Sequence, residues 1–121
     1  MSGAEKRNEI RISADRLPEE YHSFSILLPH GMEVIVHTSD ASLNGFGFYS
    51  ELDQNEFIVG CRLVLYPLGN EHPVYGIIVH SSATNKGTRV GVQLQKLGGY
   101  KNYTTAIQEI IAKPADSKHI H

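Results

Sequence analysis

The sequence has little that would tie the protein to a disulfide scaffold or a membrane. Cys61 is the only cysteine among 121 residues, so an intrachain disulfide is excluded. Its place in the apolar run 58–65 favours a small buried hydrophobe over a nucleophile. No signal-peptide pattern opens the chain, and no apolar run approaches the roughly 20 residues of a membrane span. We therefore expect a cytoplasmic protein.

The chain also lacks a strong excess of charge of one sign. Eleven lysines and arginines face thirteen acidic residues, for a formal net charge of −2. A general nucleic-acid binder usually shows a clear basic excess, so we expect no nucleic-acid polymer as partner. The basic residues near the amino terminus are interspersed with acidic ones, and a plain solvated tail is one explanation of that segment: Lys6, Arg7, Arg11 and Arg16.

No cluster of catalytic or metal-binding residues is visible. The seven histidines are scattered, and none follows a nucleophile or a base at a spacing typical of an active site. His119 and His121 have no third ligand near them, whereas a metal site normally needs three or four. The sequence thus predicts no enzyme, no metal and no cofactor.

Short segments of alternating hydrophobicity make up most of the chain. A length of 121 residues with 40% hydrophobic residues suffices for one domain. The alternation and the turn residues between segments predict six strands. We place them at residues 24–28, 33–38, 46–49, 62–66, 74–80 and 88–94. Gly76, inside the fifth strand, is interpreted as a bulge or a bend.

After Gly98-Gly99 the apolar period changes from two to about 3.6 residues. An apolar stripe of Ala106, Ile107, Ile110 and Ile111 predicts a helix of roughly ten residues. Thr105 and Gln108 fit a capping box at its start, and Pro114 ends it. Tyr100 and Tyr103 are expected to anchor the helix start.

Many short strands followed by one helix predict a six-stranded antiparallel β-barrel with a C-terminal α-helix over one open end, because closure removes exposed strand edges. We divide the chain into a flexible N-terminal arm (1–23), a barrel with its helix (24–113) and a disordered tail (114–121). A short helical turn is expected near residues 17–21.

Two short motifs stand out beside this pattern. Arg7 and Arg11 form an RxxxR motif in the arm, and Asp40, Ser42 and Gly45 form DxSxxG at the bend after the second strand. Either motif occurs by chance in many chains. The bend also has an ordinary explanation as a hairpin turn, since Asn-Gly is a common tight-turn pair and Asp and Ser often satisfy local amides.

In their order and setting, the two motifs resemble the signature of the PilZ domain family, as do residues 5–12 and 89–94 that flank them. The family fold is a six-stranded β-barrel with a carboxy-terminal helix. The resemblance implies that Arg7 and Arg11 grip guanine and phosphate of cyclic di-GMP, while Asp40, Ser42 and Gly45 form the opposite wall. Lys6, directly before the first arginine, would serve the phosphate of a second ligand, and this favours two ligands per chain.

The chemistry of these side chains suits that ligand. A guanidinium fork can bind the O6 and N7 acceptors of guanine or a phosphate bidentately. A carboxylate such as that of Asp40 accepts from the N1–H and amine donors on the other edge. The hydroxyl of Ser42 can donate and accept, and Gly45 can adopt a positive φ and approach a planar base closely.

We interpret the chain as a stand-alone bacterial receptor for cyclic di-GMP. Without an output domain of its own, it would relay the signal to an unidentified protein effector in motility, adhesion or exopolysaccharide production. The alternative is a ligand-independent PilZ-like adaptor that docks a protein partner. Loss of the arginine pair would mark that class, and this sequence retains the pair.

Overall fold

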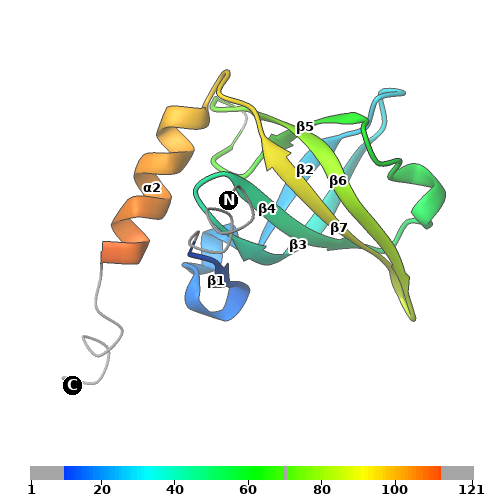
Figure 1. Ribbon diagram of the computed structural model, residues 1–121, viewed down its shortest axis with the longest axis horizontal. Coiled ribbons are helices and arrows are strands. Elements are labelled where there is room, and N and C mark those ends of the chain that lie inside the picture. Colours follow the sequence, from blue (N-terminus) through cyan, green and yellow to red (C-terminus); the bar gives the residue numbers. More distant parts are fainter. Residues whose placement is uncertain (1–9, 70, 113–121) are drawn as a thin grey trace, which may run out of the picture.

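The computed structural model describes residues 10–69 and 71–112, which form a β-barrel with one α-helix beside it (Figure 1). The barrel strands are β2 (Ser23–Leu27), β3 (Glu33–Ala41), β4 (Gly45–Ser50), β5 (Arg62–Tyr66), β6 (Val74–Thr84) and β7 (Gly87–Leu94). A two-residue strand, β1 (Ile12–Ser13), precedes them, and α2 (Tyr100–Ala112) follows them. All six predicted strands are confirmed, and most are longer than the alternation indicated.

The strands pair in the order β1-β3-β2-β5-β6-β7-β4, and a further pairing of β3 with β4 closes the ring. Every pairing is antiparallel. Closure gives each of the six barrel strands two neighbours, so none of them is left as an open edge. The predicted six-stranded barrel is therefore confirmed.

Inward-facing residues of each strand form one core. The ring of Phe24 in β2 packs at a tilt against Phe46 and edge-on against Phe48 of β4, with ring centroids 4.8 and 5.9 Å apart. Phe57, which follows the short helix η3 (Gln54–Glu56), packs edge-on against Phe48. Tyr49, the next residue along β4, points outward and is exposed. Cys61 is half-buried and packs against this core.

A bulge in β3 sets the direction of Asp40. The register between β3 and β4 shifts between Thr38 and Asp40, so Ser39 is an extra residue between the inward-facing Thr38 and Ala41. Asp40 is consequently carried on the outer face of the barrel. The sequence placed the bend at residues 39–45, which is too long: β3 continues through Ala41 and β4 begins at Gly45, so the bend is residues 42–44.

The bulge expected at Gly76 lies elsewhere. The register of β6 against β7 shifts between Ile78 and His80, so Val79 is the extra residue. Gly76 instead faces the core, where a Cβ atom would collide with the side chain of Val92. Close packing, and not a break in pairing, explains this glycine.

Residues 12–23 pack on the barrel. Ile12 pairs with Ala41 and is buried, and Leu17 is buried between two short 3-10 helices, η1 (Ala14–Arg16) and η2 (Glu19–Tyr21). The helical turn expected near residues 17–21 is confirmed by η2. The packed part of the chain thus includes residues that the sequence division assigned to the arm, while residues 1–9 lie outside the described part.

The helix α2 begins at Tyr100, one and a half turns before the predicted start at Thr105. The capping-box prediction is wrong because the first turn is held by tertiary contacts: Tyr103 is buried and its ring lies 5.4 Å from that of Phe46. Ile107 is also buried, and Ile110 and Ile111 pack against the core, so the predicted apolar stripe is confirmed.

Candidate functional site

A groove of about 780 Å³ runs along β7 and reaches the middle of β6 on one side and the first residue of β4 on the other. Its lining includes Arg11, Gly45, His80, Arg89, Gly91 and Lys96. Three of these side chains are cationic at neutral pH, and none of the lining residues is acidic. We call this hollow the cationic groove. Such a surface suits an anionic ligand.

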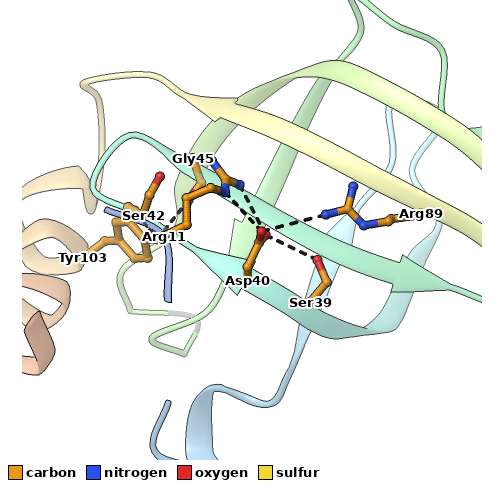
Figure 2. A network of polar contacts seen from close by, with 7 residues as sticks. All are labelled: Arg11, Ser39, Asp40, Ser42, Gly45, Arg89 and Tyr103. Atoms are coloured by element: carbon orange, nitrogen blue, oxygen red, sulfur yellow. Dashed lines mark hydrogen bonds and ion pairs between the residues drawn. The ribbon is translucent and has the colours of Figure 1, made fainter. Parts of the chain in front are cut away.

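Arg11 and Asp40 form a bidentate ion pair at the edge of the groove. Arg11 Nε donates to Asp40 Oδ2 over 3.1 Å, and Nη2 donates to Oδ1 over 3.2 Å (Figure 2). The two residues come together because Arg11 directly precedes β1, whose Ser13 pairs with Asp40. The structure thus brings one residue of the RxxxR motif into contact with the first residue of DxSxxG.

A glycine makes room for the carboxylate of Asp40. Gly47 pairs with Asp40 across β3 and β4. A Cβ atom at Gly47 would collide with Asp40 Oδ1 and come within 2.6 Å of Ser39 Oγ. The carboxylate therefore lies directly over the backbone of β4, in a position that any larger residue at 47 would fill.

Gly45 lies in the lining of the groove, but its backbone differs from the expected one. The described glycines with positive φ are Gly31, Gly60, Gly69, Gly87 and Gly98, so the prediction of a positive φ at Gly45 is wrong. The position is crowded instead. A Cβ there would lie 3.2 Å from the carbonyl oxygen of Val92 and 3.4 Å from Ser42 Oγ.

Ser42 lies beneath the turn and is fully buried. Its backbone N–H donates to the carbonyl of Gly45 over 3.0 Å, which closes the turn. Its Oγ is buried without a hydrogen-bond partner among the described residues. The side chain therefore lies next to Gly45 and outside the lining of the groove.

Two tyrosines of α2 hold this turn from behind. The hydroxyl of Tyr103 donates to the carbonyl of Ser42 over 2.7 Å and contacts that of Gly45 at 3.2 Å (Figure 2). The hydroxyl of Tyr100 donates to Asn44 Oδ1 over 2.7 Å. The prediction that these tyrosines anchor the helix start is confirmed, and the anchor point is the candidate site itself.

Of the six residues selected from the sequence, the structure brings together Asp40, Arg11 and Gly45, with Ser42 just below. Lys6 and Arg7 lie outside the described residues. Sequence reasoning missed Arg89, whose Nη2 lies 3.8 Å from Asp40 Oδ2, and it missed Gly47. A signal for Arg89 existed, because the alternation of residues 88–94 already put Arg89, Gly91 and Gln93 on the face opposite the core.

Other kinds of site find no support in the part of the chain that the structure describes. It contains no group of three or more His, Cys, Asp or Glu side chains that could hold a metal ion. Within 10–69 and 71–112, the one long helix is too short and too polar to cross a membrane.

Comparison of the sequence with protein-family models and with curated proteins finds no match. Comparison of the structure with solved structures does. The PlzA protein of Borreliella burgdorferi, in complex with cyclic di-GMP, is similar at a TM-score of 0.66 and 15% identity. The match covers 90% of this chain and 43% of PlzA, so the chain spans less than half of that protein.

Two further structures are similar. The PilZ domain of YcgR from Escherichia coli, with cyclic di-GMP, has a TM-score of 0.63 and 17% identity over 94% of this chain and 97% of that domain. The inhibitor of motility MotI from Bacillus subtilis has a TM-score of 0.58 and 12% identity over 87% of this chain and 49% of that protein.

A closed six-stranded antiparallel barrel is followed by one helix, which packs behind the β3–β4 turn. That architecture, and its match along nearly the whole length of the YcgR domain, is the PilZ-domain fold. The fold that the motif resemblance implied is confirmed.

Proposed function

We propose that this protein is a receptor for cyclic di-GMP, which binds in the cationic groove between the RxxxR segment and the DxSxxG turn. The observation that carries the proposal is the Arg11–Asp40 ion pair at the edge of the groove. It joins the two motifs in one place, on a fold whose solved examples include complexes with cyclic di-GMP.

The groups at the groove match the polarity of the ligand. Cyclic di-GMP carries two phosphodiester anions, which the guanidinium of Arg11 can bind through two parallel N–H groups. Its guanines present N–H donors to a carboxylate and acceptors to an arginine fork. Asp40 offers the carboxylate, with a side chain 20% exposed, and Arg11 offers the fork, at 49%.

The remaining motif residues complete the proposed site. Arg7 lies four positions before Arg11, and with Lys6 it would fold over the ligand from the side opposite the turn. Gly45 lines the groove beside the ligand, and Ser42, whose hydroxyl is buried outside the lining, would bond to the ligand only if the turn moved. Whether one or two molecules bind is decided by titration.

We further propose that ligand binding is relayed to a protein effector in motility, adhesion or exopolysaccharide production. A ligand bound by both Arg7 and Arg11 would change the surface beside the groove. Exposed apolar residues occur there already: Val79 lines the groove and is 52% exposed. The ligand can shift the equilibrium between two conformations only by the difference between its binding free energies for them.

Alanine variants of the two motif arginines test the receptor proposal. Because a hydrogen bond to a charged group contributes about 1.5–3 kcal/mol, Arg7→Ala or Arg11→Ala should weaken binding of cyclic di-GMP by about 10- to 100-fold. Isothermal titration measures this, and thermal melting of the ligand-free variants shows whether the barrel is intact.

Arg16→Ala is the matched control, since Arg16 is an exposed arginine of η1 outside the groove and should bind as the wild type does. Wild-type affinity in both motif variants would contradict the assignment. A wild-type chain that binds no cyclic di-GMP would leave the fold unchanged and favour a ligand-independent adaptor.

A further inference from the structure

Arg89 of β7 is a second described arginine at Asp40, on the opposite side from Arg11. Figure 2 shows the two guanidinium groups approaching the carboxylate from opposite directions. Neither the RxxxR nor the DxSxxG motif includes Arg89. Its side chain lines the cationic groove and is 36% exposed.

The register of the barrel explains where Arg89 points. On β7, Val90 and Val92 face the core and are buried, so Arg89, Gly91 and Gln93 face outward. Gly91 pairs with Gly47 of β4 on one side and with His80 of β6 on the other. Both glycines lack a side chain, but the Asp40 carboxylate covers Gly47, so the uncovered backbone beside Arg89 is that of Gly91, which lines the groove.

The contact of Arg89 with Asp40 is an ion pair without a hydrogen bond. Its Nη2–Oδ2 distance is 3.8 Å, beyond the 2.7–3.2 Å of an N–H···O bond, whereas Arg11 makes bonds of 3.1 and 3.2 Å. Asp40 therefore attracts the Arg89 guanidinium toward the groove without accepting a hydrogen bond from it. The N–H groups of Arg89 remain available to an anion.

We propose that Arg89 is a third ligand-binding arginine, which donates to a phosphodiester of cyclic di-GMP lying over Gly91. This inference rests on the proposed function. A cyclic dinucleotide has two phosphodiesters on one ring, so an arginine on each side of Asp40 lets both be bound from the barrel surface. Asp40 then has two roles, as an acceptor and as the anion that positions both guanidinium groups.

Isothermal titration of cyclic di-GMP into the wild type and into Arg89→Ala, Arg89→Gln and Arg89→Lys tests this proposal. Loss of the charged donor should weaken binding by about 10- to 100-fold in the alanine and glutamine variants. Arg62→Ala is the matched control, because Arg62 is an exposed arginine on the outer face of β5 and lies outside the groove. It should bind as the wild type does.

Salt dependence separates a direct contact from a structural role. Raising the salt concentration by about one order of magnitude, from 50 to 500 mM, screens exposed charges. If Arg89 contacts a phosphate, this change should weaken the binding of cyclic di-GMP more in the wild type than in Arg89→Ala. Arg89→Lys, which keeps the charge, should retain the salt dependence of the wild type. Melting temperatures of the ligand-free variants show that each is folded.

The outcomes are distinct. If the wild type binds and both neutral variants bind within about twofold of it, the role of Arg89 is overturned and the receptor proposal stands. If the neutral variants lose affinity but keep the full salt dependence of the wild type, Arg89 acts without meeting a phosphate and the inference is wrong. If the wild type does not bind, the proposed function fails, and this inference fails with it. Should Arg89→Ala not fold, Arg89→Gln, which keeps a long polar side chain, decides.

Discussion

Asp40 is the residue on which the candidate site depends. In the ligand-free chain its carboxylate lies over Gly47, accepts two hydrogen bonds from Arg11 and attracts Arg89. An exposed ion pair of this kind stabilises a fold by only about 0–1 kcal/mol. The ion pair is therefore important for positioning, since Asp40 holds the side chains of Arg11 and Arg89 beside the groove.

Substitution of Gly47 tests this positional role. Gly47→Ala should displace the Asp40 carboxylate, because the new Cβ would occupy its place, and it should weaken binding of cyclic di-GMP by about 10-fold. Isothermal titration measures the affinity, and circular dichroism checks that the barrel remains folded.

A double-mutant cycle provides the control. If Gly47 acts through Asp40, adding Gly47→Ala to an Asp40→Asn variant should cost little further affinity, because coupled substitutions are not additive. Full additivity of the two effects would contradict the positional role.

At the scale of single residues, the sequence predicted those site residues that belong to a recognised motif. Arg11 and Asp40 were selected because their motifs resemble the PilZ signature, and they are in contact. Arg89 and Gly47 were missed because their importance comes from cross-strand register: a carboxylate on β3 needs a glycine on β4, and an arginine reaches it from β7. Register depends on where bulges fall, and the bulge at Ser39 has no distinctive sequence signal.

At the scale of elements, α2 and the β3–β4 turn form one unit. The hydroxyls of Tyr100 and Tyr103 hold Asn44 and the turn carbonyls, and Tyr103 is buried against Phe46. The helix thus supports the wall of the candidate site. A ligand that moves the turn must also act on α2, so the helix is one route by which binding can reach the rest of the surface.

Removal of one hydroxyl tests this unit. Tyr103→Phe removes the hydroxyl that donates to the carbonyl of Ser42, whereas the carbonyl of Gly45 still accepts from the N–H of Ser42, and it should lower the free energy of unfolding by about 1–3 kcal/mol. It should also weaken ligand binding, because the turn loses its support. Chemical denaturation and titration measure the two effects.

Tyr49→Phe is the control, since Tyr49 is an outward-facing tyrosine of β4 and is 45% exposed. The free energy of unfolding of Tyr49→Phe should lie within about 0.5 kcal/mol of the wild-type value, as is usual for surface substitutions. Equal stability of Tyr103→Phe and the wild type would show that the helix does not depend on this bond.

The elements themselves were largely predictable. Strand positions followed from alternation, because each strand buries one face, as in Val90 and Val92. Helix boundaries were harder: a capping box at Thr105 was outweighed by the burial and hydrogen bonds of Tyr103, which draw a further turn into α2. Tertiary contacts of this kind do not appear in local sequence.

For the whole molecule, the barrel places residues from three distant segments beside one groove. Arg11, Asp40, Gly45 and Arg89 come from the segment before β1 and from β3, β4 and β7. The pairing of β3 with β4, which closes the barrel, brings Arg11 and Asp40 beside Gly45 and Arg89. The sequence predicted this closure from the number of short strands, which only a ring pairs completely.

The receptor proposal is tested by titrating cyclic di-GMP into the pure wild-type chain, with cyclic di-AMP and GTP as controls. We expect saturable binding of cyclic di-GMP alone, and the stoichiometry gives one or two ligands per chain. The melting temperature should rise with ligand, because a ligand at 100 times its Kd stabilises the native state by about 2.7 kcal/mol. No heat and an unshifted melting temperature, or equal binding of all three nucleotides, would contradict a cyclic di-GMP receptor.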